Sequence, residues 1–271
     1  MKLGVRAHDY GKHSVKDFAQ LLKREGYKTV QLAIPKAFTG INSFDDITED
    51  LLEEIRQEFT KNSIEIAVLG CYQDLGNPDK SIREAAVKTF KKALLHSKIL
   101  GAQMVGTETS YARLSETDKT ACFPFMMESI YAIVNEAEKL DAVIGIEPVS
   151  WHPLKDAETA AMVLNTVKSS HLKIILDPAN IFPSDLSVSQ DSYWKNVLGL
   201  LQNDIRAVHI KDFSTDKDGQ YVPKPLGGGI MKFDILRQWI LTKPDLPVLR
   251  EEMNPLSAHK DISFLKFFQA P

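Results

Sequence analysis

This chain of 271 residues has only two cysteines, no excess of basic charge and no long apolar run. The two cysteines, Cys71 and Cys122, lie far apart and form no CxxC pair, which argues against a disulfide framework and suits a reducing cytosol. No apolar stretch approaches the roughly 18–20 residues that a membrane-spanning helix needs. The N-terminal residues meet charge too early to contain the apolar core of a signal peptide. These absences predict a soluble cytoplasmic protein with no membrane partner.

An excess of positive charge is also missing. The chain has 33 Lys and Arg against 36 Asp and Glu, a net charge of −3, so it offers no broad electrostatic attraction for nucleic acid. Its apolar content of 44% and charged content of 25% are ordinary for a globular enzyme. The length fits one large domain over residues 1–271.

Strand and helix patterns alternate along the whole chain. The expected strands are Lys2–Ala7, Thr29–Ile34, Ile64–Tyr72, Met104–Thr109, Val143–Pro148, Lys173–Asp177, Ile205–Lys211 and Pro247–Glu251. The expected helices are Ser14–Tyr27, Thr48–Lys61, Lys80–Leu100, Phe123–Leu140, Asp156–Lys168, Gln190–Leu201, Phe233–Ile240 and Ala258–Phe268, with caps at Ser14, Thr48 and Gly101. Eight strand–helix units without a break in composition predict a (β/α)8 TIM barrel. An open doubly wound sheet is the alternative, but Arg6–Tyr10 lacks the glycine fingerprint that usually follows its first strand.

Three irregular stretches follow expected strands: Pro35–Ile47, Ser110–Ala121 and Phe213–Lys232. Loops of this length in a compact domain are often functional. In a barrel they lie on the face that carries the active site.

Four apolar runs in the second half of the chain end in a side chain that can bind a metal. Glu147, Asp177, His209 and Glu251 each come two residues after an apolar residue or glycine, namely Gly145, Ile175, Ala207 and Leu249. Residues two apart in a strand share a face, so parallel strands would bring these three carboxylates and one imidazole to one rim. Buried together, such groups are costly unless they are paired or bound to a cation. The mixed oxygen and nitrogen donors predict one divalent ion: Mn²⁺, Mg²⁺, Co²⁺ or Zn²⁺.

Five motifs around these residues occur in a definite order. They are Gly145–His152 (GIEPVSWH), Leu176–Asn180 (LDPAN), Val208–Asp212 (VHIKD), Pro225–Asp234 (PLGGGIMKFD) and the strand-ending Glu251. With them the chain resembles the sugar phosphate isomerase/epimerase family of the xylose-isomerase-like TIM-barrel superfamily, which includes ketose 3-epimerases and inosose isomerases and dehydratases. The resemblance covers essentially the whole chain and is strongest from residue 143 onward.

The resemblance implies that Glu147, Asp177, His209 and Glu251 hold one divalent metal, and that Glu147 and Glu251 are also the catalytic acid/base pair. The expected activity is isomerisation or epimerisation of a sugar, sugar phosphate or cyclitol through an enediolate, whose charge needs a Lewis acid. A cyclitol or sugar dehydratase is the alternative. An endonuclease with several zinc ions is disfavoured, because the chain has too few ligands for a trinuclear cluster, and a non-catalytic sugar-binding barrel is disfavoured by the intact ligand set.

Other polar residues near the strand ends are candidates for substrate binding. They are His8, Glu108, His152, Asn180 and Lys211; Asn180 stands where many ketose epimerases carry a histidine. Asp212 has the opposite strand parity and is expected to orient Lys211 or cap backbone. Gly227–Gly229 is interpreted as a tight turn, with a phosphate-binding nest as the alternative. Leu265–Phe268 is interpreted as packing of the last helix, with a homo-oligomer contact as the alternative.

Overall fold

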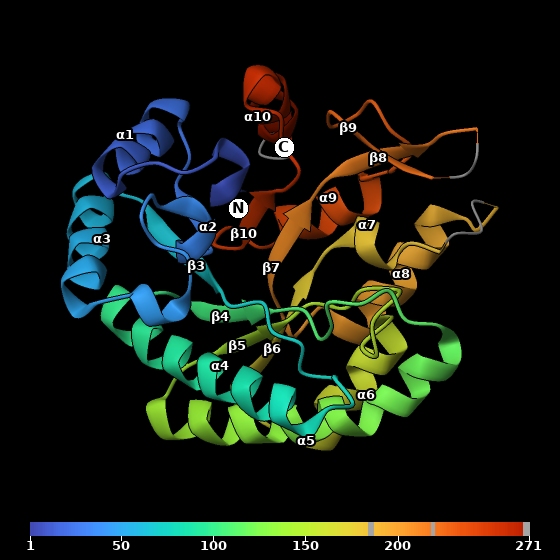
Figure 1. Cartoon of the computed structure of the whole chain (residues 1–271). Helices are drawn as coiled ribbons and strands as arrows, with labels where there is room; N and C mark the ends of the chain where they lie inside the picture. Colours follow the sequence, from blue (N-terminus) through green and yellow to red (C-terminus); the bar gives the residue numbers. More distant parts are fainter. Residues whose placement is uncertain (184–186, 218–219, 268–271) are drawn as a thin grey trace.

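A computed structural model describes residues 1–183, 187–217 and 220–267 of the chain. Eight parallel strands close into a barrel in the order β1-β10-β7-β6-β5-β4-β3-β2, with helices around the outside (Figure 1). The predicted TIM barrel is therefore confirmed. The barrel strands are β1 (Lys2–Arg6), β2 (Thr29–Leu32), β3 (Glu65–Gly70), β4 (Met104–Thr107), β5 (Ile144–Ile146), β6 (Leu172–Leu176), β7 (Ile205–Ile210) and β10 (Pro247–Arg250).

The long helices follow the strands, as the sequence predicts. They are α1 (Val15–Glu25), α3 (Glu49–Lys61), α4 (Lys80–Leu100), α5 (Glu116–Leu140), α6 (Ala157–Val167), α8 (Gln190–Leu201), α9 (Asp234–Leu241) and α10 (Ala258–Phe267). The Ser14 and Thr48 side chains cap α1 and α3 by accepting hydrogen bonds from backbone N–H groups, and Gly101 ends α4 at a φ of 65°. Phe268, the expected end of the last helix, lies outside the described residues. Among the helices of the described ranges, none combines the length and apolarity that a membrane crossing needs.

The barrel interior is filled by small and branched side chains. One buried cluster consists of Ala67, Val68, Met104, Ile175, Ala207 and Leu249. Gly145 faces the same space, because a Cβ there would come within 2.8 Å of Ile175 and 2.7 Å of Met104. Ile175, Ala207, Leu249 and Gly145 are the residues that sequence parity placed on the inner face. The next inward position on each strand lies at the rim.

All three expected irregular stretches contain regular structure, and the one after β4 includes the start of α5. Residues 35–47 include part of the short helix α2 (Ile34–Ala37) and the 3₁₀ turn η2 (Phe44–Asp46). The stretch after β7 forms an antiparallel hairpin of β8 (Asp212–Thr215) and β9 (Tyr221–Lys224), which projects from the end of β7 (Figure 1).

The helix expected from Phe123 begins earlier than predicted. Ser115 caps α5 by accepting a hydrogen bond from the Asp118 N–H, with Glu116 and Asp118 in the first turn. Pro124 therefore lies in the interior of the helix and not in its first turn. The loop after β4 is correspondingly shorter than 110–121.

Candidate metal centre and the cavity at the barrel mouth

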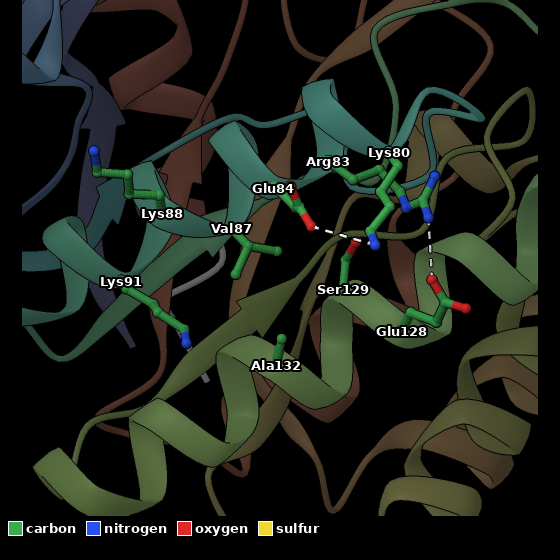
Figure 2. Close-up of a pocket in the computed structure, with 9 residues that line it drawn as sticks. All are labelled: Lys80, Arg83, Glu84, Val87, Lys88, Lys91, Glu128, Ser129 and Ala132. Carbon is green, nitrogen blue, oxygen red and sulfur yellow. Dashed lines mark hydrogen bonds and ion pairs between the residues drawn. The ribbon is translucent and has the colours of Figure 1, made fainter.

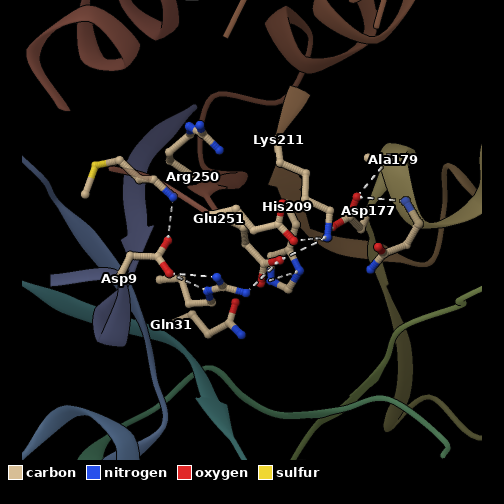
Figure 3. A network of polar contacts seen from close by, with 12 residues as sticks. Asp9, Gln31, Asp177, Ala179, His209, Lys211, Arg250 and Glu251 are labelled. Carbon is tan, nitrogen blue, oxygen red and sulfur yellow. Dashed lines mark hydrogen bonds and ion pairs between the residues drawn. The ribbon is translucent and has the colours of Figure 1, made fainter. Parts of the chain in front are cut away.

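Three of the four expected metal ligands form one compact group at the C-terminal rim of the barrel. Glu147, Asp177 and His209 follow or end β5, β6 and β7, and each offers a ligand atom within 4.8 Å of the others. All three side chains are buried. The strand-end parity thus brings an imidazole and two carboxylates from three adjacent strands together (Figure 3 shows Asp177 and His209).

Local hydrogen bonds fix the two carboxylates of this group. Asp177 caps the short helix α7 (Pro178–Ile181), because its Oδ1 accepts from the N–H groups of Ala179 at 2.8 Å and Asn180 at 3.2 Å. The Asn180 side chain donates from Nδ2 to Glu147 Oε1 at 2.6 Å. The second oxygen of each carboxylate contacts a different group: Glu147 Oε2 contacts His209, and Asp177 Oδ2 contacts Lys211. Asn180, predicted to touch substrate, here orients a candidate metal ligand.

Glu251 follows β10 and approaches the same histidine. Nδ1 of His209 lies 3.0 Å from Glu147 Oε2 and 3.3 Å from Glu251 Oε1. Glu251 Oε2 is drawn toward two cations, at 3.4 Å from Arg6 Nη1 and 3.5 Å from Lys211 Nζ. Its ligand atoms therefore lie outside the compact group of three.

The ammonium of Lys211 is buried among the carboxylates. Its Nζ lies 2.9 Å from Asp177 Oδ2 and 3.8 Å from Glu252 Oε1 (Figure 3 shows the pair with Asp177). Burial alone would lower the pKa of Lys211, but Asp177, Glu251 and Glu252 hold that pKa well above its usual value. Lys211 is therefore charged. Lys211 comes two residues after His209 and, like it, points to the centre of the rim.

The acidic groups respond to this charge in different ways. Burial raises the pKa of Asp177 to about 6, against the opposing effect of Lys211. Burial would also raise the pKa of Glu251, but His209, Arg6 and Lys211 hold it below its usual range. Burial would lower the pKa of His209, and the Glu251 and Glu147 carboxylates overcome this and raise it to about 9. Opposite charges thus hold the cluster together.

The donor atoms of the group suit a divalent cation. Within the described chain, Nε2 of His209 is buried and has neither a hydrogen bond nor an ion pair, whereas His209 Nδ1 and Asp177 Oδ2 have only the ion pairs described above. Buried polar atoms without such partners are uncommon in folded proteins. Oxygen and imidazole nitrogen donors fit Mn²⁺, Mg²⁺, Co²⁺ or Zn²⁺. The residues present therefore fit a single divalent ion.

A cavity of about 260 Å³ opens beside this group. It is lined by the predicted residues His8, Glu108, His152 and Glu251 and by Arg6, Lys36, Tyr72, Gln73, Ser110, Tyr111 and Trp151. Burial and the positive charges of Arg6 and Lys36 lower the pKa of His8 to about 4. Burial and Arg113 lower the pKa of His152 to about 4, whereas burial with Glu147 and Glu251 raises the pKa of Glu108 to about 8. At neutral pH the cavity therefore presents two neutral imidazoles and a largely protonated carboxyl group.

Arg6 is the most informative cavity residue that sequence reasoning missed. Its guanidinium pairs with Asp9 at 2.7 Å and with Glu251 at 3.4 Å, and Asp9 also accepts from the Met253 N–H at 3.0 Å. The signal was present, because Arg6 lies two residues after Gly4. A Cβ at Gly4 would meet Leu249 of the inner cluster at 2.6 Å. The parity rule used for the other strands thus also selects Arg6.

Asp212 was expected either to orient Lys211 or to cap backbone groups, and the structure shows that it caps backbone groups. Its buried carboxylate accepts from the N–H groups of Phe213, Gly227, Gly229 and Met231 at 2.9–3.1 Å. The N–H groups of Gly227 and Gly229 are thus used inside the protein. This arrangement favours the tight-turn interpretation of the three glycines.

A second hollow lies on the outer wall of the barrel, between α4 and α5 (Figure 2). Its volume is about 450 Å³, and its charged groups pair with one another: Lys80 with Glu84 at 3.7 Å and Arg83 with Glu128 at 3.1 Å. It lies far from the strand ends that carry His209 and the carboxylates. The candidate chemistry of this protein therefore lies at the barrel mouth.

The fold and the rim define a class of protein, and comparison with known proteins agrees. The family model of the Xylose isomerase-like TIM barrel matches residues 19–266, and the chain belongs to this family. A comparison with curated proteins gives no match.

Solved structures share the fold at low sequence identity. A 3-keto-D-glucoside 4-epimerase from E. coli is 14% identical with a TM-score of 0.77, over 98% of this chain and 99% of that one. A probable 3-DHS dehydratase from Bacillus anthracis is 15% identical with a TM-score of 0.74, over 98% and 99%. A xylose isomerase-like TIM barrel protein from Mycobacterium smegmatis, in complex with magnesium, is 15% identical with a TM-score of 0.71, over 98% and 96%.

Proposed function

We propose that this protein is a metal-dependent isomerase or epimerase of a sugar, sugar phosphate or cyclitol. The observation that carries the proposal is the group of Glu147, Asp177 and His209, whose ligand atoms lie within 4.8 Å of one another beside a polar cavity. Glu251 is proposed as the fourth ligand, reached by a small movement away from Arg6 and Lys211. A divalent ion held there would act as a Lewis acid for negative charge that develops on substrate oxygens.

The protein's own side chains supply the proton transfers in this proposal. Glu147 and Glu251 come from β5 and β10, which β6 and β7 separate in the barrel. One carboxylate removes the proton from the carbon beside the carbonyl. The second returns a proton, to the opposite face of the same carbon for epimerisation or to the adjacent carbon for isomerisation.

Other residues of the rim bind and orient the substrate. The Lys211 ammonium donates hydrogen bonds to substrate oxygens that gain negative charge. His8 and His152, neutral at pH 7 because their pKa values are about 4, bind hydroxyl groups in the cavity. Asn180 holds Glu147 in position through its hydrogen bond to Oε1.

A dehydratase is the second candidate, and one observation favours it. Glu108 lines the cavity and has its pKa raised to about 8, so at neutral pH it retains a proton. A protonated carboxyl group can act as a general acid toward a leaving hydroxyl. Product analysis separates the candidates, because a dehydratase releases water whereas an isomerase conserves the mass of its substrate.

Metal binding tests the proposal first. Protein stripped with chelator and reloaded with Mn²⁺ should approach one equivalent per chain. Asp177→Ala and His209→Ala should bind Mn²⁺ far more weakly, while the surface variant Lys80→Ala should bind it like the parent. Ligand variants that bind as tightly as the parent would show that the assignment is wrong.

Turnover in D₂O tests the chemistry. We expect a screen of ketoses, ketose phosphates and cyclitols with Mn²⁺ to find a substrate that gains deuterium on the carbon beside the carbonyl. A primary isotope effect with the migrating hydrogen retained would instead indicate a hydride shift and contradict the two-glutamate mechanism. Binding of sugars without any exchange or conversion would leave only a sugar-binding barrel.

A further inference from the structure

A groove of about 1050 Å³ adjoins the catalytic cavity at Trp151. Trp151 lines both spaces, with Glu108, His152 and Glu251 on the cavity side. The groove is lined on its other sides by Ala179, Phe182 and Pro183, by the start of α5 and by the β8–β9 hairpin. Two compartments of unequal size thus meet at one indole ring. The smaller one, about 260 Å³, lies below the usual range of about 300–1,000 Å³ for small-molecule sites.

The groove presents several aromatic rings. Phe213 and Tyr221, one on each strand of the hairpin, stack with their centroids 4.9 Å apart and an angle of 24° between their planes. Trp151 is held by the Arg113 guanidinium, 4.1 Å from the centre of its ring. Phe182 lines the same space. Flat, supported rings of this kind offer contact area at little cost in conformational entropy.

The charges on the groove walls are largely balanced. Glu116 contacts Lys119 and lies 2.9 Å from Lys155. Lys119 also donates to the Ser150 carbonyl at 2.8 Å, and Asp156 caps α6 by accepting from the Thr159 N–H at 2.7 Å. Among the groove charges that the structure describes, Arg113 has no ion pair, and it is committed to the Trp151 ring. The walls therefore suit a neutral ligand that has both apolar faces and polar edges.

A sugar ring has this character. Its C–H groups form apolar faces that pack on aromatic rings, and its hydroxyl groups point outward from the ring edge. The groove supplies hydrogen-bonding partners for such hydroxyls, since it is lined by the guanidinium of Arg113 and by Ser150 and Thr215.

Contacts also connect the groove with the reaction centre. The Tyr221 hydroxyl donates to the Glu252 carboxylate, and Glu252 lies 3.8 Å from Lys211. Lys211 in turn is 2.9 Å from Asp177. A ligand resting against Tyr221 therefore lies a short chain of contacts away from the candidate metal ligands. A substrate could span both compartments.

From these observations we infer that the groove binds a second sugar ring, so that the substrate is a glycosylated ketose or cyclitol rather than a free monosaccharide. The inference rests on the proposed function, which assigns the reacting ring to the cavity. The catalytic cavity takes the ring that carries the carbonyl. The groove takes the attached ring against Trp151, Phe213 and Tyr221.

The experiment compares the affinities of matched sugar pairs. Isothermal titration and saturation-transfer NMR with Mg²⁺-loaded protein would use fructose and its glucosyl derivatives isomaltulose, turanose and leucrose. We expect at least one disaccharide to bind about tenfold more tightly than fructose, which is the upper range for one aromatic stacking contact. Tyr221→Ala and Tyr221→Leu should remove this ratio, and Tyr221→Phe should retain it. Correct folding of each variant is checked by its Mg²⁺ stoichiometry.

Several outcomes would overturn the inference. Equal affinity for fructose and every disaccharide, or no binding of any of them, would do so, as would a ratio that persists in Tyr221→Ala. Tighter binding of fructose 6-phosphate that depends on Arg113 would show that the groove holds an anion instead. A parent dimer that Tyr221→Ala converts to monomers would show that a second chain covers the groove. Normal metal binding together with turnover of monosaccharides alone would refute the inference while supporting the proposed function.

Discussion

Glu251 and Glu252 are adjacent in the sequence, but their carboxylates have different surroundings. Glu251 is buried beside His209 and Arg6. Glu252 has a positive φ of 54°, and its carboxylate contacts Tyr221 at the mouth of the barrel. If the strand continued, its alternation would direct the Glu252 side chain toward the helices, as it does that of Arg250. This prediction is wrong, because β10 ends at Arg250 and the backbone turns directly after Glu251.

The first prediction uses this pair as a matched set. Glu251→Gln keeps an oxygen ligand but removes the base, so turnover should fall by about 10²–10⁴-fold. Its metal affinity should fall less than that of Glu251→Ala. Glu252→Gln should keep most of the activity and the metal affinity. Steady-state kinetics and Mn²⁺ titration measure both, and an active Glu251→Gln beside an inactive Glu252→Gln would exchange the two roles.

The second prediction concerns pH and Glu108. The pKa of Glu108 is raised from 4.5 to about 8 in the folded chain, by burial and by the nearby carboxylates. A raised pKa means that the folded state holds the proton more tightly than the unfolded state, so this stabilising contribution is complete below about pH 4.5. It is lost as the pH rises through about 8.

Glu108→Gln has no proton to lose at this position. In chelator-treated protein, the free energy of unfolding should therefore decline less between pH 5 and pH 9 in this variant than in the parent. Chemical denaturation at several pH values measures the difference. Parallel curves for the two proteins would contradict the assigned pKa.

Strand parity predicts some residues of the candidate site but not others. Parity along strands selects Glu147, Asp177, His209, Glu251 and Lys211, because the apolar residues before them must face the barrel interior. It does not select Lys36, which enters the cavity from α2, a short helix within an expected loop. Nor does parity show that Asn180 would bond to Glu147, because that contact joins α7 to the end of β5.

At the scale of elements, the β8–β9 hairpin forms most of one wall of the groove. Its strands pair from Asp212 with Lys224 to Thr215 with Tyr221. Pro223 opposes Phe213 in this ribbon. A proline normally argues against a strand, and it is tolerated here because a two-stranded ribbon has two open edges. Pro223 taken alone would therefore argue against the strand that forms here.

The third prediction tests the turn that anchors this hairpin. A Cβ at Gly229 would lie 2.1 Å from Asp212 Oδ1 and 2.3 Å from the Phe213 carbonyl oxygen. Gly229→Ala should therefore break the hydrogen bonds to the Asp212 carboxylate and lower the free energy of unfolding by about 2–4 kcal/mol. Urea denaturation measures the change.

Gly199 is the matched control, because it lies in α8 and a Cβ there would meet nothing within 4 Å. Gly199→Ala should stabilise the protein by about 0.5–1 kcal/mol, since alanine loses less backbone entropy in a helix. Equal effects of the two substitutions would show that the close approach of the Gly229 backbone to Asp212 is unimportant.

At the scale of the whole molecule, the barrel closes where β10 meets β1, and contacts on both faces of β10 tie it to other elements. On the inside, Arg6 and Asp9 link the end of β1 to Glu251 and to the Met253 N–H. On the outside, Arg250 donates from Nε to Asp261 Oδ2 at 2.8 Å, and both side chains are buried. The sequence predicts the closed barrel through its eight repeated units. It does not predict these seam contacts, since they join residues from the two ends of the chain or from a strand and the last helix.

The last prediction concerns Arg250 in β10 and Asp261 in α10, whose hydrogen bonds reach several other elements of the fold. Besides its pair with Asp261, Arg250 donates to the carbonyl groups of Ile210 in β7 and Lys224 in β9, each at 3.4 Å. Asp261 also accepts from the Leu226 N–H at 2.9 Å. Asp261→Ala would leave a buried guanidinium without its counter-charge, which typically costs about 3–5 kcal/mol of unfolding free energy.

Replacing both partners should cost less than replacing one. The double variant Arg250→Met/Asp261→Leu has no buried charge to leave unpaired, so we expect it to be more stable than Asp261→Ala, although the Leu226 N–H still loses its acceptor. Thermal and urea unfolding of the parent, Arg250→Met, Asp261→Leu and the double variant form a complete cycle. If the double variant were as unstable as the sum of the single variants, the two residues would act independently. The attachment of α10 and the hairpin to β10 would then depend on apolar packing rather than on this ion pair.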